Sequence, residues 1–113
     1  MNNTLRKIRK AREFSREIDG WNLKLRRPTD AEATLFKGEE ISHIEIGKKF
    51  VIGWEDVTEE KLVPGGSSDP VEFDPDLWAE VLVDQPQIWD KLTSAILESF
   101  LLYRKAKEDR VKK

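Results

Sequence analysis

The C-terminal third of this sequence carries an apolar surface that is wider than the core-facing stripe of an ordinary amphipathic helix. One stripe recurs at helical spacing, and further apolar side chains lie beside it. The stripe consists of Ile88, Leu92, Ala95, Ile96, Ser99 and Tyr103, and the flanking residues are Trp89, Leu97, Phe100 and Leu101. A helix with this pattern needs cover on more than one side. In a chain of 113 residues, that cover comes either from the chain's own smaller elements or from another protein.

Two segments in this half of the chain carry the signals that begin a helix. In the first, Asp74 can cap the backbone and Pro75 can occupy the first helical position. This predicts a helix over residues 75–83. Its expected core-facing side chains are Leu77, Trp78, Val81 and Leu82. Asp84 and Pro86 repeat the pattern and begin the long C-terminal helix, which we expect to continue to about Lys107.

The N-terminal part contains a strong β-hairpin signal, because Asp19-Gly20 favours the two-residue turn that joins antiparallel strands. In the register set by this turn, one face of the hairpin is mostly apolar and the other is polar. The first face pairs Phe14 with Leu25, Arg16 with Leu23, and Ile18 with Trp21. The second pairs Glu13 with Arg26, Ser15 with Lys24, and Glu17 with Asn22. We therefore predict a half-buried ribbon with a Glu13–Arg26 charge pair.

The segment between the hairpin and Asp74 is less regular. Thr29 and Glu32 have the spacing of a capping box. They predict a helix that ends near Gly38 and can pack Ala33, Leu35 and Phe36 inward. Residues 41–57 fit both the strand and the helix period, and we favour a helix over residues 42–54. Residues 62–70 are rich in glycine, proline and serine and predict a flexible loop.

Together these segments predict an α+β protein with an N-terminal antiparallel β-hairpin, three to four helices after it, and a long C-terminal helix. We expect residues 13–107 to form a single domain. Residues 1–12 are a basic arm or a short helix, and residues 108–113 a charged tail.

Charge is strongly segregated along the chain. Residues 1–12 hold five bases and no acid, and residues 104–113 hold six bases and two acids. Residues 54–90 hold eleven acids and one lysine. Such polarity steers association with charged partners, including other copies of the same chain. The structural alternative is that both basic ends are solvated helix termini.

The sequence offers little for catalysis or ligand binding. It has no cysteine, and His43 is its single histidine, so no disulfide framework or multi-histidine metal site is expected. The loop around Gly65 lacks the lysine of a phosphate-binding loop. We predict no catalytic, cofactor or metal site, and no enzyme activity. No apolar stretch has the length of a membrane span, so we expect no membrane association and a cytoplasmic location.

Several segments resemble the tail assembly chaperones of long-tailed, siphovirus-type bacteriophages. They are residues 21–30 (WNLKLRRPTD), residues 50–57 (FVIGWEDV), residues 70–78 (PVEFDPDLW), Pro86 and residues 95–100 (AILESF). The resemblance spans about residues 14–103. It rests on packing and turn residues, and it leaves the two basic ends unmatched.

The resemblance implies a protein of the host cell cytoplasm that binds the phage tape measure protein, recruits tail tube protein and is absent from the finished virion. It also implies, in many relatives, a longer frameshifted form. The wide apolar surface of the last helix and the segregated charges suit a homo-oligomer. We expect the partner or oligomer interface to include Trp89, Leu92, Ile96, Phe100, Leu101 and Tyr103. For Leu92 and Ile96 the alternative is simple core packing.

Two other functions stay open. The basic patch of Arg6, Lys7, Arg9, Lys10 and Arg12 suits a small nucleic-acid-binding protein. The acidic middle of the chain argues against that role. The third possibility is a generic homo-oligomerising interaction domain without a role in phage assembly.

Overall fold

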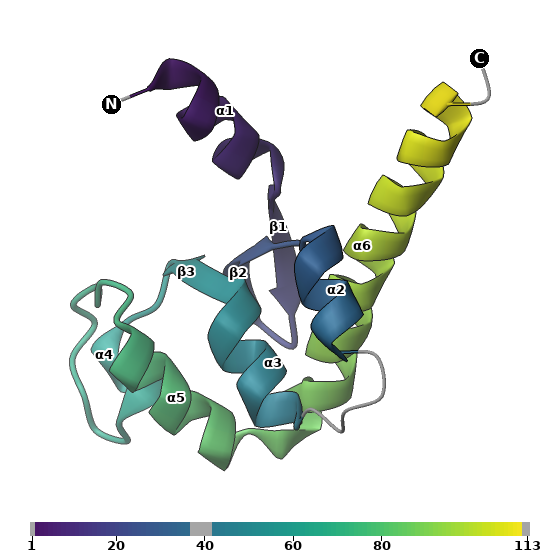
Figure 1. The fold of residues 1–113 in the computed structure, drawn as a ribbon. Helices are drawn as coiled ribbons and strands as arrows, with labels where there is room; N and C mark the ends of the chain where they lie inside the picture. The colour runs from purple at the N-terminus through teal and green to yellow at the C-terminus, as the bar shows by residue number, and fades with distance from the viewer. Residues whose placement is uncertain (1, 37–41, 112–113) are drawn as a thin grey trace.

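The structure is a computed structural model, and it describes residues 2–36 and 42–111. These residues form an α+β fold with a three-stranded antiparallel sheet, six α-helices and one short 3₁₀ helix (Figure 1). The elements are α1 (Asn3–Ala11), β1 (Glu13–Ile18), β2 (Trp21–Arg26), α2 (Asp30–Phe36), α3 (His43–Phe50), β3 (Val51–Glu55), α4 (Glu59–Leu62), α5 (Pro75–Asp84), η1 (Pro86–Ile88) and α6 (Trp89–Val111). The predicted class is confirmed, but the sequence predicted neither the third strand nor this number of helices.

The hairpin has the predicted register, from Glu13 opposite Arg26 to Ile18 opposite Trp21. Its turn works because Asp19 and Gly20 both adopt positive φ angles, 49° and 86°, as a tight two-residue turn requires. The predicted charge pair is wrong. Arg26 turns to Glu32 on α2, with an Nη1–Oε1 distance of 2.8 Å, and Glu13 pairs instead with Lys24 at 3.2 Å.

The predicted helix over residues 42–54 is also wrong in its second half. Helix α3 ends at Phe50, and β3 pairs antiparallel with β2. Trp54 lies opposite Leu23 and Val51 opposite Leu25, with a register shift between them. This irregularity places both Val51 and Trp54 on the core face although they are three residues apart. Their spacing therefore imitates a helical period.

The core lies between one face of the sheet and helices α3, α5 and α6. Trp78 on α5 is at its centre, fully buried, and its indole N–H donates to the Gly47 carbonyl of α3 at 2.9 Å. The Trp78 ring meets the Trp21 ring edge-on at a centroid distance of 6.3 Å. The predicted helix α5 is confirmed, with the Asp74 carboxylate capping its start. Leu77, however, is 38% exposed and not in the core, because burial of Trp78 and Leu82 turns it to the helix border.

The predicted capping box begins α2. The Thr29 hydroxyl accepts from the Glu32 N–H at 3.1 Å, and a Glu32 carboxylate oxygen accepts from the Thr29 N–H at 3.0 Å. Both carboxylate oxygens of Glu32 also accept from the Arg26 guanidinium at 2.8 Å. The predicted helix end at Gly38 and the side chains of Leu35 and Phe36 lie outside the described part of the chain.

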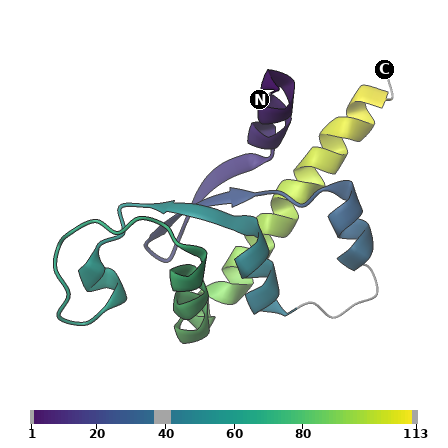
Figure 2. The same cartoon turned by 60° about the vertical axis from the view of Figure 1, so that its left-hand side comes forward.

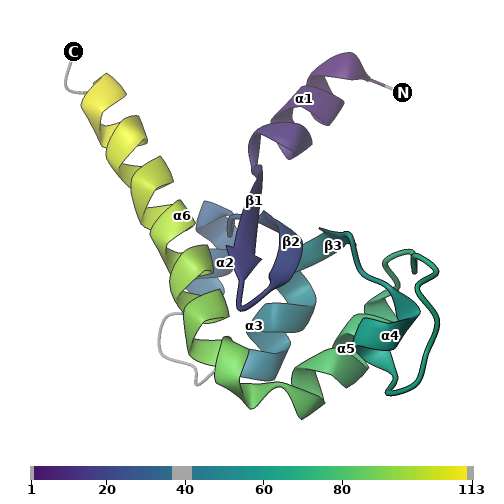
Figure 3. The ribbon, with the colours of Figure 1, turned by 180° about the vertical axis from the view of Figure 1, so that it is seen from behind.

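The two ends of the chain project from the body of the protein. Helix α1, capped by the Asn2 side chain, has no buried residue, and α6 continues past the expected Lys107 to Val111. Figures 2 and 3 show both helices leaving the sheet on the same side, opposite α5. A bridge between Thr58 and Pro70 closes the segment that contains α4 and the loop after it. Among the described residues, no helix is long and apolar enough to cross a membrane.

We predict that Trp78→Phe lowers the free energy of unfolding by about 2 kcal/mol, because it opens a cavity in a closed core and removes a buried hydrogen bond. Trp89→Phe is the matched control. It removes an equivalent bond, from the indole to the Leu82 carbonyl, at a half-buried position that water can refill. Urea unfolding should give a clearly smaller loss for this control, and equal losses would contradict the central role of Trp78.

The free energy of unfolding should depend on pH through the ionisation of Glu32. The hydrogen bonds from Arg26 lower the pKa of Glu32 from 4.5 to about 2. A lowered carboxyl pKa stabilises the folded state above pH 4.5, and this contribution is lost as the pH falls toward 2. Glu32→Gln should therefore cost about 2 kcal/mol at pH 6 and almost nothing near pH 2. Urea titrations across this range test it, with Glu98→Gln, an exposed and distant partner of Arg16, as the control.

Candidate interaction surface

The first half of α6 is committed to the core. Leu92 and Ile96 are buried, together with Ile88 and Ala95, against the rest of the hydrophobic cluster. Two of the six predicted interface residues therefore have the alternative role of core packing. They can affect a partner only by holding the helix in place.

Trp89 fastens the start of α6 to its neighbours. Its indole N–H donates to the Leu82 carbonyl at the end of α5 at 2.8 Å. Its ring also stacks on the His43 imidazole of α3, with the centroids 6.1 Å apart. The His43 Nδ1 lies 2.9 Å from the Thr93 hydroxyl of α6. The single histidine of the chain therefore contributes to packing between α3 and α6. Trp89 itself is half-buried.

The second half of α6 is held against the beginning of α2 by polar and aromatic contacts. The Tyr103 hydroxyl donates to a carboxylate oxygen of Asp30 at 3.0 Å, and the Lys107 ammonium donates to the same oxygen at 2.9 Å. The Arg27 guanidinium carbon lies 3.5 Å from the centre of the Tyr103 ring. These four residues, Arg27, Asp30, Tyr103 and Lys107, are called the α2 anchor below.

The pKa shifts of Asp30, Lys107 and Arg27 agree with the contacts of the α2 anchor. The hydrogen bond from Lys107, followed by that from Tyr103, lowers the pKa of Asp30 below its usual value. The same contact with Asp30 raises the pKa of Lys107. Desolvation lowers the pKa of Arg27, because its guanidinium is partly buried against the Tyr103 ring. Tyr103 is therefore engaged within the chain and only partly open to a partner.

What remains exposed is a leucine strip on the outer side of α6. Leu97 is 53% exposed and Leu101 is 61% exposed, and their four-residue spacing puts them on one face. Phe100 borders the strip, is partly buried, and has the Arg104 guanidinium over its ring at 5.9 Å. Leu102 is 60% exposed but points to a different side, one residue of helical rotation away. We call Leu97, Phe100, Leu101 and Arg104 the α6 strip.

Of the six residues predicted from sequence, Leu101 alone is mostly exposed, while Phe100, Tyr103 and Trp89 are partly buried. The prediction did not include Leu97 or Arg104. The signal for Leu97 was present, because it lies one helical turn before Leu101.

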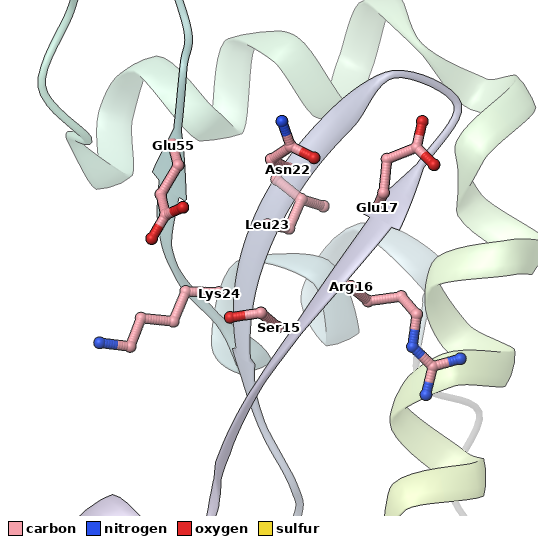
Figure 4. Close-up of a pocket in the computed structure, with 7 residues that line it drawn as sticks. All are labelled: Ser15, Arg16, Glu17, Asn22, Leu23, Lys24 and Glu55. Atoms are coloured by element: carbon pink, nitrogen blue, oxygen red, sulfur yellow. The ribbon is translucent and has the colours of Figure 1, made fainter.

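Two depressions on the surface of the described residues do not resemble a catalytic centre. One lies on the solvent face of the sheet and is lined mainly by Ser15, Glu17, Asn22, Lys24 and Glu55. Figure 4 shows these side chains spread over an open surface, with Lys24 and Arg16 extending away from one another. The other runs between the hairpin turn and α6, where Lys91 is paired with Asp19. Within residues 2–36 and 42–111, no group of three or more acidic or histidine side chains is placed to hold a metal ion.

Comparison with known proteins adds no relative: no family model, no curated protein and no solved structure matches this chain. The resemblance to phage tail assembly chaperones therefore stays a prediction. It has to be judged on the residues that carry it.

We predict that the α2 anchor holds the second half of α6 in place. Tyr103→Leu removes both the hydroxyl bond to Asp30 and the ring under Arg27. It should raise amide hydrogen exchange over residues 99–107 about tenfold. Lys105→Ala, on an exposed side of the same turn, is the control and should leave exchange in this segment nearly unchanged. Unaltered exchange in Tyr103→Leu would mean that α6 holds its position without the anchor.

Proposed function

We propose that this protein binds a helical segment of another protein along the α6 strip and acts as a phage tail assembly chaperone. Its partners in this proposal are the tape measure protein, the tail tube protein and further copies of itself, and it works in the host cell cytoplasm. The observation that carries the proposal is the exposure of Leu97 and Leu101 on a helix whose first half is anchored in the core.

The form of the α6 strip favours a helical partner. Two leucines one turn apart, bordered by an aromatic ring, are the kind of anchor that an amphipathic helix uses when it packs along another helix. Arg104, next to the leucines, can pair with an acidic side chain on such a partner. A rigid base supports this surface, because the core and the α2 anchor fix α6 on both sides of it.

The residues that carry the family resemblance have a consistent place in the fold. Trp54 packs on Phe73 with ring centroids 5.1 Å apart, and its indole N–H donates to the Val71 carbonyl at 2.8 Å. Asp74 caps α5, which delivers Trp78 to the centre of the core. The shared segments are thus a packing signature for this arrangement of strand, loop and helices. They specify how this chain packs, while the proposed chaperone role rests on the α6 strip.

The proposal expects a long, helix-rich open reading frame directly downstream of this gene, and the test is coexpression with its product. We expect it to copurify with the wild-type chain and to stay in the soluble fraction. Leu101→Ser should weaken this binding about tenfold, because a leucine buried at an interface contributes about 1.5–3 kcal/mol. Leu102→Ser is a matched control, since the residue type, the helix and the exposed fraction are nearly the same. The proposal fails if nothing copurifies, or if both variants bind equally well.

A further inference from the structure

Helix α1 is an amphipathic basic helix that buries none of its residues against the rest of the described chain. Leu5 and Ile8 are 41% and 49% exposed and share one face. Arg9 borders this face, whereas Lys7 and Lys10 lie on the other sides of the helix. None of the ion pairs between described residues involves these three bases. An isolated helix of this length is marginal in water, so α1 would gain stability from an apolar and acidic surface.

The outer face of α5 has the complementary chemistry. Its exposed side chains include Leu77 and Val83, and between them lie the carboxylates of Asp76, Glu80 and Asp84. Within the described part of the chain, these three carboxylates take part in no ion pair. The two helices also match in length, about 14 Å for α1 and about 15 Å for α5.

The two faces do not meet within one molecule. Figures 1 and 3 show α1 at one end of the protein and α5 at the other, with the sheet between them. The basic end of α6 lies at the same end as α1, and the acidic segment around α4 lies at the same end as α5. The protein is therefore electrically polar from end to end, and its complementary surfaces point in opposite directions.

We propose that α1 of one copy docks on the outer face of α5 of a second copy. Leu5 and Ile8 then lie over the α5 face that Leu77 and Val83 border, and Arg9 faces Glu80 and Asp84. Lys10, on the far side of α1, adds to the attraction through its charge. A pair of copies keeps one free basic α1 face and one free acidic α5 face, so the contact repeats head to tail and forms a ring or an open filament. This inference rests on the self-association named in the proposed function, and it assigns that association to two surfaces separate from the α6 strip.

A nucleic acid fits the same helix less well. Phosphates would pair with the bases of α1 but would leave Leu5 and Ile8 without apolar contacts. The acidic half of the protein would also repel a polyanion. The α5 face satisfies both the bases and the apolar side chains, and we therefore favour a second copy as the occupant.

Paired charge reversals test the contact. Arg9→Glu with Lys10→Glu gives a chain with two acidic faces, and Glu80→Lys with Asp84→Lys gives a chain with two basic faces. All four positions are exposed, and circular dichroism checks that both variants fold. Light scattering should show wild-type mass rising with concentration at low salt and falling at high salt. Each variant alone should stay at the monomer mass of 13.2 kDa. An equimolar mixture should recover the assembly, because the acidic α1 of one variant meets the basic α5 of the other.

The matched control is Lys105→Glu with Arg110→Glu, which makes the same change in net charge on exposed positions of α6. It should reduce assembly far less than the reversal in α1. A constant wild-type monomer, equal loss in the control, or a mixture that stays monomeric would each overturn the inference. The inference would also fail if the charge reversal in α1 abolished retention of the protein on double-stranded DNA without lowering the mass measured by light scattering. Copurification through the α6 strip is measured separately, so that failure of the head-to-tail contact and failure of the proposed function can be distinguished.

Discussion

The close approach of α3, α5 and α6 beneath the sheet is the constraint on which the rest of the structure depends. Gly47 makes it possible, because a Cβ atom there would lie 3.0 Å from both Leu82 methyl groups and 3.2 Å from a Leu92 methyl group. The Gly47 carbonyl then receives the Trp78 indole N–H. A glycine and a tryptophan from different helices thus meet in one dense contact, and this contact sets the position from which α6 leaves the core.

The two halves of helix α6 have different roles. Its first half supplies apolar side chains to the core, and its second half is held by the polar α2 anchor, whose contacts need little apolar area. Because polar contacts hold one side of the distal half, its leucines on the outer side are left uncovered. This division explains how a protein of this size can present a fixed apolar strip. The proposed binding of a helical partner follows from that division.

Charge segregation along the chain becomes separation in space through the topology. The hairpin returns the chain to the middle of the molecule, so α1 stays at one end, and the acidic segment is carried to the other end by β3 and the loop before α5. Complementary charges that are neighbours neither in sequence nor in space cannot neutralise one another. They stay available for contacts between molecules, and this is the physical basis of the head-to-tail contact proposed above.

Local signals in the sequence predicted the elements whose interactions lie within a few residues. The turn at Asp19-Gly20 set the hairpin register, Thr29 and Glu32 began α2, and Asp74 with Pro75 began α5, because each depends on neighbouring backbone groups. Strand β3 was missed, since its pairing with β2 and its irregular register exist only once the strands meet. For the same reason, periodicity placed Leu92, Leu101 and Tyr103 on one broad apolar surface, whereas tertiary packing decided their roles. The core covers Leu92, whereas Tyr103 is engaged by Asp30 and Arg27. Leu101 stays exposed, because no other described element covers its side of α6.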